Sequence, residues 1–329
     1  MKTKNSSAKL LASFLAFGSI LTFLAFCSAA DPEPVSPVEP VTQKLSDAQP
    51  IPNLPFTISQ SGSYCLTQNL THTNQNTNAI EVNADNVTID LAGFSLIGPG
   101  SNSGASSGIH MNGRANVEIR NGTITGFGDS GIWEEDSEAA TGHRVISVRV
   151  LSNGGTGIEL ASQNNLVKDC TVSNNCLAVT TAWGGISCSH ASSIIGNVVS
   201  NHGVFSGIIT DSGCTISGNT VSGNGWGIRV WYGCNVTGNT CSWDFDGISA
   251  PGNGNLIKGN TVLGSIQNGI VADGAYNSIE ENLVTLCETG INFTNSANFY
   301  ANNRAFNNTT NYGGTLPTGI RNGGGNIGF

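Results

Sequence analysis

The chain has 329 residues, of which only 11% are charged and 43 are glycine, and its formal net charge is −9. An acidic chain of this kind is a poor partner for nucleic acid or anionic lipid, so we expect neither. Low charge combined with many small polar residues is typical of disorder, but the regular spacing of Val and Ile residues favours a folded chain.

The first thirty residues predict export. Three lysines precede an apolar run over residues 10–26, and small residues at 28–30 offer a cleavage site. We therefore expect a signal peptide over residues 1–30 and a protein that is secreted, periplasmic or held at the cell surface. A lipoprotein anchored at Cys27 is less favoured, because Phe26 stands where a small residue is needed. No other stretch has the ~20 apolar residues of a membrane span.

Residues 31–55 contain seven of the ten prolines and predict an extended, acidic linker. The remaining body, residues 56–329, has only three prolines. Because proline cannot donate a ladder hydrogen bond, this scarcity is typical of a chain that is mostly strand.

Two residue columns repeat through this body. The dipeptide Gly-Ile recurs at intervals of 20 to 28 residues, with its glycines at Gly108, Gly131, Gly157, Gly185, Gly207, Gly227, Gly247, Gly269 and Gly290. A column of asparagines keeps step with it at Asn197, Asn219, Asn239, Asn260 and Asn282. The intervals are too short for helix pairs, and the leucines and helix formers of leucine-rich repeats are missing.

These columns predict an all-β solenoid, a single-stranded parallel β-helix of about ten coils with three short strands in each coil. Strand alternation places the Ile of Gly-Ile inside and the next residue outside. Glycine is expected to provide the backbone conformations of the corners, and the asparagines to hydrogen-bond from coil to coil. Aligning residues 86–98 with 116–128 also makes Asp90 and Arg120 neighbours, and residues 56–70 are expected to cap the N-terminal end.

Three segments carry a family resemblance: GSYCLTQNL at 62–70, IDLAGFSLIG at 89–98 and RNGTITGF at 120–127, followed by GN(T/V)V and Gly-Ile units. Together they resemble the secreted right-handed parallel β-helix proteins of the pectin-lyase-like superfamily, over residues 56–329. The resemblance implies a right-handed coil and carbohydrate as the commonest ligand. Neither the Asn-Thr-Asp and Gly-His-Gly motifs of polygalacturonases nor the Asp-Pro-His-Glu motif of alginate epimerases is present, so no catalytic residue is carried over.

The outward positions of successive coils bring together a first candidate cluster, formed by His110, Trp133, Glu135 and Glu159. Two carboxylates and a histidine beside an aromatic ring suit general acid and base catalysis on a sugar, because apolar surroundings raise the pKa of a carboxyl group. A solvated acidic face with one packed tryptophan is the alternative reading.

A second candidate cluster lies two to three coils further on and comprises Asp211, Arg229, Trp231, Trp243, Asp244 and Asp246. Tryptophan offers a flat face for a sugar ring, and Arg229 could form paired hydrogen bonds with a uronate carboxylate. Asp211 with Asp244 or Asp246 is a candidate acid and base pair, and outward-facing Asp273 is a further candidate ligand residue. The alternative is structural, with Arg229 neutralising the stacked aspartates.

Eight cysteines remain after removal of the signal peptide. Cys214 and Cys234 occupy the same register one coil apart, which predicts a disulfide between them in an oxidising compartment. Cys170 and Cys241 are expected to be small buried core residues.

No metal site is expected, because His72, His190 and His202 share neither a column nor the spacing of metal ligands. Calcium bound by backbone and aspartate oxygens stays open as a cofactor, although the nonapeptide calcium repeat is missing.

Two functions compete at this stage. The first is a protein that binds extracellular polysaccharide, uronate-containing or neutral, and processes it as a polysaccharide lyase or glycoside hydrolase. The alternative is a non-catalytic cell-surface or structural rod. We expect a monomer in both cases. The long repeat intervals between Gly131 and Gly185 are the only internal candidates for groove-building loops, and the minimal length of the other coils favours binding or structure over catalysis.

Overall fold

The computed structural model describes residues 47–135, 137, 140–178 and 182–328; the predicted signal peptide and residues 31–46 of the predicted linker lie outside them. The described residues form two parallel sheets, of 12 and 22 strands, and a single 3-10 turn, η2 (Gly319–Arg321). They contain no helix with the length and apolarity of a membrane span. The chain is therefore all-β, as predicted.

The 12-stranded sheet takes one strand from each coil. Its members, in order, are β2 (Phe56–Ile58), β5 (Ile80–Val82), β8 (Ile109–Asn112), β10 (Ile132–Glu135), β12 (Ile158–Leu160), β15 (Gly184–Cys188), β18 (Ser206–Ser212), β21 (Trp226–Tyr232), β24 (Asp246–Ala250), β27 (Asn268–Ala272), β30 (Thr289–Phe293) and β33 (Thr310–Gly314). Twelve coils are thus present, close to the predicted ten.

The 22-stranded sheet supplies the other two faces of the coil. One face contains β1 (Gln49–Ile51), β3 (Gly62–Leu66), β6 (Val87–Asp90), β9 (Val117–Thr125), β11 (Arg144–Leu151), β13 (Leu166–Lys168), β16 (Ser193–Ile195), β19 (Thr215–Ser217), β22 (Asn235–Thr237), β25 (Leu256–Lys258), β28 (Ser278–Glu280) and β31 (Phe299–Ala301). The long strands β9 and β11 continue around the corner into the other face.

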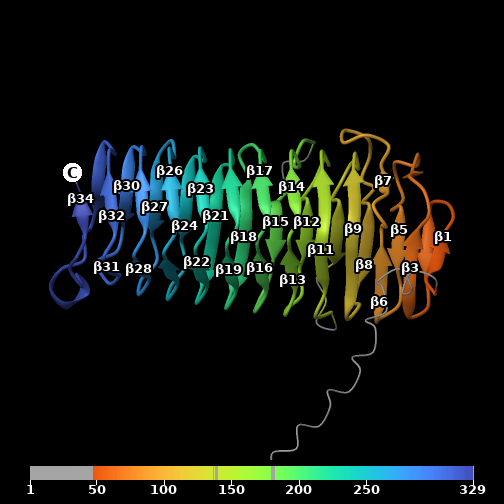
Figure 1. Ribbon diagram of the computed structural model, residues 1–329, viewed down its shortest axis with the longest axis horizontal. Helices are drawn as coiled ribbons and strands as arrows, with labels where there is room; N and C mark the ends of the chain where they lie inside the picture. Colours follow the sequence, from red (N-terminus) through yellow and green to blue (C-terminus); the bar gives the residue numbers. More distant parts are fainter. Residues whose placement is uncertain (1–46, 136, 138–139, 179–181, 329) are drawn as a thin grey trace, which may run out of the picture. The chain divides into compact units, whose positions relative to one another are not determined.

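That third face is completed by β4 (Leu70–Thr71), β7 (Ser95–Ile97), β14 (Thr171–Ser173), β17 (Val198–Ser200), β20 (Thr220–Ser222), β23 (Thr240–Ser242), β26 (Thr261–Leu263), β29 (Leu283–Thr285), β32 (Arg304–Phe306) and β34 (Ile327–Gly328). Figure 1 shows the coils following one another in sequence order, from β1 at one end to β34 at the other. Crossovers between parallel strands of one sheet are right-handed in nearly all proteins, which agrees with the right-handed coil implied by the resemblance.

The core runs through the lumen of the coils. Ile208 pairs with Ile228, and Ile228 pairs with Ile248, each one coil further on, and all three side chains are fully buried. Each buried isoleucine contributes about 1.5–3 kcal/mol of transfer free energy, but only because neighbouring coils cover it. The predicted inward stack is confirmed.

The asparagine column forms the predicted ladder at one corner. The backbone N–H and the side-chain amide of Asn219 both donate to Oδ1 of Asn239, at 2.9 Å. The same amide also donates to the carbonyl of Ile194 on the preceding coil at 2.9 Å. Asn239 repeats the pattern toward Asn260. Buried polar groups at this corner are therefore satisfied without water.

Glycine has two distinct roles in the coil. Gly238 precedes the ladder residue Asn239 and has φ +65°, so glycine does supply a corner conformation there, as predicted. The glycines of the Gly-Ile dipeptides are required for a different reason, which the sequence prediction missed. A Cβ on Gly227 would lie 2.4 Å from the carbonyl oxygen of Gly247 and 2.6 Å from Oδ2 of Asp244. This position needs glycine for space and not for backbone freedom.

The N-terminal end differs in detail from the prediction. Strand pairing begins at β1, inside the segment predicted as linker, because Gln49–Ile51 pairs with β3. Residues 56–70 form the first coil and not a separate cap, since β2 and β3 pair with β5 and β6. The predicted contact between Asp90 and Arg120 is confirmed by an ion pair at 2.9 Å.

The predicted disulfide is absent: Cys214 and Cys234 are both free, buried thiols. Each belongs to an inward corner column. The thiol of Cys214 donates to the carbonyl of Ser189 at 2.8 Å, and the backbone N–H of Cys234 donates to Oδ1 of Asn255 at 2.8 Å. Adjacent coils lie about 4.8 Å apart, which brings the two thiols into side-chain hydrogen-bond contact, but they are not covalently joined. Cys170 and Cys241 are buried, as predicted.

Candidate functional site

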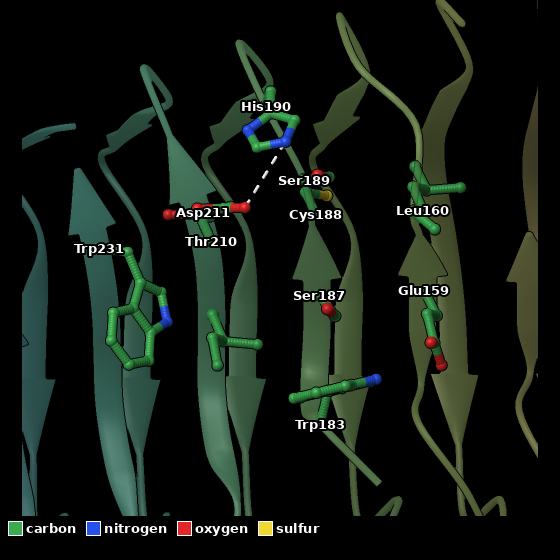
Figure 2. A pocket seen from close by; sticks show the side chains of 12 residues that line it. Glu159, Leu160, Trp183, Ser187, Cys188, Ser189, His190, Thr210, Asp211 and Trp231 are labelled. Atoms are coloured by element: carbon green, nitrogen blue, oxygen red, sulfur yellow. Dashed lines mark ion pairs between the residues drawn. The ribbon is translucent and has the colours of Figure 1, made fainter. Parts of the chain in front are cut away.

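A groove of about 600 Å³ lies on the outer face of the 12-stranded sheet and crosses β12, β15, β18 and β21 (Figure 2). Its lining includes two tryptophans, two carboxylates, a histidine and hydroxyl groups, chiefly Glu159, Trp183, Ser187, His190, Asp211 and Trp231. Four adjacent strands span three inter-strand spacings, which gives the groove a length of roughly 14 Å.

Strand register brings these side chains to one face. Glu159 pairs with Ser187, and Ser187 with Ile209, at the outward position that follows each Gly-Ile. Asp211 and Trp231 lie two residues further along their strands, at positions that also face outward. The groove floor therefore consists of two parallel rows of outward-facing side chains. One row follows Gly-Ile directly, and the other lies two residues further along each strand.

Trp183 and Trp231 provide the aromatic surfaces of the groove. Trp183 comes from the inserted segment before β15 and is 55% exposed. Figure 2 shows its ring nitrogen on the side of Glu159, and Trp231 on the far side of the groove. An exposed indole ring presents a flat apolar face that stacks on the apolar face of a sugar.

Glu159 is half-buried, and burial raises the pKa of its carboxyl group. The charge of Asp129 also raises this pKa, whereas hydrogen bonds with the side chains of Thr156 and Trp183 lower it. No ion pair of the described residues includes Glu159. The groove thus contains a carboxyl group whose charged form lacks a cationic partner.

Asp211 differs, because it faces the imidazole ring of His190. His190 Nε2 lies 3.5 Å from the Asp211 carboxylate (Figure 2). Nδ1 of the same ring is 2.7 Å from the hydroxyl of Ser212. Both partners are about half exposed, so the pair contributes at most about 1 kcal/mol to stability. Its main effect is to orient the imidazole at the rim of the groove.

Arg229 does not line the groove but supports it. Its guanidinium carbon lies 4.6 Å from the ring centre of Trp226 and 5.4 Å from that of Trp231. These two cation–π contacts help to hold the Trp231 ring in place. The predicted paired contact of Arg229 with a ligand carboxylate stays a prediction.

The structure does not bring the remaining members of the second predicted cluster to the groove. Asp244 is fully buried and accepts hydrogen bonds from the backbone and amide of Asn224, at 2.8 and 2.9 Å. Burial raises the pKa of Asp244 to about 7. Asp246 is also buried, and it accepts hydrogen bonds from Asn268.

Trp243 and Asp273 are exposed but lie outside the groove. Trp243 is 63% exposed at the corner before β24, where its φ is +57°. Asp273 follows the end of β27. The pair formed by Asp211 with Asp244 or Asp246 is therefore not assembled, because one member faces solvent and the others face the interior or are covered.

The first predicted cluster is largely assembled. The rings of His110 and Trp133 lie 4.5 Å apart between centroids, and His110 Nε2 is 3.7 Å from a Glu135 oxygen. Glu81, which the sequence prediction missed, lies 2.6 Å from His110 Nδ1. Glu159 pairs in register with Trp133 but contributes to the groove. Catalytic roles for these residues stay predictions.

The sequence analysis also missed Trp183, and it gave His190 no functional role because this histidine shares no column with the other histidines. A signal for Trp183 was present, since it lies in the 28-residue interval between Gly157 and Gly185, the longest in the repeat. Such an interval indicates inserted residues but does not show which of them faces the sheet.

Residues 182–323 match the family model described as "Periplasmic copper-binding protein (NosD)". No curated protein matches the chain. Among solved structures, the Dettilon tailspike protein is similar, with a TM-score of 0.50 and 15% identity over 78% of this chain and 53% of the tailspike. The chain is a parallel β-helix protein. It spans about half the length of that tailspike.

Two further β-helix structures are similar at lower scores. The Azotobacter vinelandii mannuronan C-5 epimerase AlgE6 A-module has a TM-score of 0.46 and 12% identity over 83% of both chains. The alginate lyase AlyF-OU02, in complex with G6, has a TM-score of 0.43 and 15% identity over 83% of this chain and 57% of its own. At these identities the likeness concerns the fold alone.

Proposed function

We propose that this chain is an exported β-helix protein that binds a saccharide chain in the groove across β12, β15, β18 and β21. The observation that carries the proposal is the pair of tryptophans, Trp183 and Trp231, which flank a surface of hydroxyl and carboxylate groups. Saccharides present alternating apolar faces and hydroxyl groups, and this lining offers a partner for each. The basic and apolar N-terminal sequence and the periplasmic family description support export.

Binding is favoured over catalysis by the spacing of the two groove carboxylates. Glu159 and Asp211 are two coils and two residues apart, a backbone separation of roughly 12 Å. Side chains stand nearly perpendicular to a sheet, so their carboxyl groups keep a similar separation. Glycosidase pairs are about 5–9.5 Å apart. The raised pKa of Glu159 nevertheless makes a lyase or hydrolase the second candidate, with this residue as the acid.

The copper named by the family description is not part of the proposal. The described residues contain no group of three or more His, Cys, Asp or Glu side chains placed to hold a metal ion. The ring of His110 is engaged by Glu81 at 2.6 Å and packs against the tilted ring of Trp133 at 4.5 Å between centroids. These residues do not fit a copper centre, whose geometry demands several convergent nitrogen or sulfur ligands.

The binding proposal is tested by titrating the protein with oligosaccharides while following tryptophan fluorescence, and by affinity electrophoresis in gels that contain polysaccharide. Trp231→Ala and Trp183→Ala should each weaken binding by about two- to tenfold, as expected for loss of one aromatic stacking surface. Trp243→Ala is the matched control, because that ring is exposed outside the groove. Equal effects of all three substitutions would remove the groove from consideration.

The catalytic alternative is tested separately. The purified protein is incubated with uronate and neutral polysaccharides, and unsaturated products and reducing ends are measured. Product formation that disappears in Glu159→Gln would support an enzyme and overturn the purely binding role. Retardation in the gel without product would support binding.

A further inference from the structure

We infer that the groove selects saccharides that carry a protonated amino group. The inference rests on the proposed binding function and concerns the charge of its ligand. It starts from the lining, which holds two carboxylates, Glu159 and Asp211, and includes neither lysine nor arginine. The ring of His190 is engaged by Asp211 at 3.5 Å and by the hydroxyl of Ser212 at 2.7 Å.

Glu159 is the groove residue at which we expect a ligand cation to bind. It is half-buried and has no ion pair within the described chain, and the nearby charge of Asp129 adds further negative potential. An unpaired carboxylate that is partly removed from water is unfavourable unless a partner neutralises it. The hydrogen bonds from Thr156 and Trp183 leave the negative charge of Glu159 in place, and a ligand ammonium group would neutralise it through a charge-assisted hydrogen bond.

The adjoining surface extends the same charge preference. On the coils before Glu159, the single imidazole of His110 faces both Glu81 and Glu135, at 2.6 and 3.7 Å. On the other side, the positive charge of Arg229 is already covered by two indole rings. A uronate carboxylate would therefore meet like charges at Glu159 and Asp211, which is destabilising.

The two tryptophans favour an amino sugar over a simple polyamine as the ligand. Trp183 lies beside Glu159 and directs its ring N–H to that carboxylate, so an ammonium group bound to Glu159 would lie next to the indole ring that stacks on the sugar. Trp231 at the other end offers a second stacking surface that a linear polyamine has no ring to use. The ligand that fits both features is a short run of sugar rings with an amino group on at least one of them.

The experiment compares three hexasaccharides by isothermal titration calorimetry on the full chain: β-1,4-linked glucosamine, its N-acetylated form and galacturonate. N-acetylation removes the charge while keeping the rings, so the glucosamine hexamer should bind about tenfold or more tightly than the acetylated one. Raising NaCl from about 0.05 to about 0.5 M should weaken only the charged interaction. Glu159→Gln should lower affinity for glucosamine about tenfold and leave the acetylated hexamer nearly unchanged.

Asp273→Asn is the control, because it removes one exposed negative charge outside the groove, and circular dichroism of both variants checks their fold. Equal affinity for the charged and acetylated hexamers, or tightest binding of galacturonate, would overturn the inference while leaving saccharide binding intact. Spermidine binding as tightly as the glucosamine hexamer would overturn the assignment to a saccharide. Failure of every hexamer to bind would remove the proposed function itself.

Discussion

A carboxylate buried inside the coil should make this protein less stable at alkaline pH. Asp244 occupies a corner column whose other members include Asn224 and Asn308, and one of its oxygens, Oδ2, has no hydrogen-bond partner. Burial raises the pKa of Asp244 from 3.8 to about 7. Replacement with asparagine keeps the acceptor for Asn224 and removes the charge, so Asp244→Asn should stabilise the fold.

The size of the effect follows from the pKa shift. A group whose pKa is raised by folding contributes full stability below its unfolded pKa and loses it as the pH rises through its folded pKa. The loss therefore runs from about pH 4 to about pH 7. At 1.36 kcal/mol per pKa unit, a shift from 3.8 to about 7 corresponds to about 4 kcal/mol at pH 8, of which about 3 kcal/mol is lost between pH 5 and pH 8.

The assay is urea unfolding at pH 5 and pH 8 for the wild type and Asp244→Asn, with the free energy of unfolding obtained by linear extrapolation. At pH 8 the free energy of unfolding of Asp244→Asn should exceed that of the wild type by several kcal/mol. The variant should also show most of the wild type's difference in free energy of unfolding between pH 5 and pH 8 abolished. Asn239→Asp is the converse control, since it places a carboxylate in the equivalent ladder and should introduce the same pH dependence. Identical pH dependence in wild type and Asp244→Asn would refute the reasoning.

Three further predictions concern the coil. Burial lowers the pKa of His202 to about 4, so stability should fall as pH drops from 6.5 toward 4, and His202→Asn should remove that loss in acid unfolding curves. Gly227→Ala should destabilise by about 1–3 kcal/mol or more through steric overlap, whereas Gly238→Ala should cost about 1–2 kcal/mol through backbone strain, both measured by urea unfolding. Mass spectrometry after alkylation without reduction should find Cys214 and Cys234 both modified; a bridged peptide would contradict the free thiols.

The sequence alone was sufficient to predict that the coils stack on one another in register. Residues such as Ile208 and Ile228 recur at a nearly constant interval, and a constant interval places equivalent residues of adjacent coils in register. Register then decides which side chains touch, which is why the contact between Asp90 and Arg120 and the ladder through Asn219 could be predicted. Nearest-neighbour contacts of a repeat need no knowledge of the rest of the fold.

The groove and the corners required the tertiary structure. Period-two alternation predicts direction only within a strand, and at the turn the left-handed backbone of Trp243 directs Asp244 inward, where its carboxylate joins a buried column. Trp183 lies in a segment outside the repeat, so no register from neighbouring coils fixed its position beside Glu159. The sequence by itself determined the parallel coil, because that depends on a repeated local pattern; only the folded chain decided which carboxylates are buried and where a groove forms, because turns and insertions break that pattern.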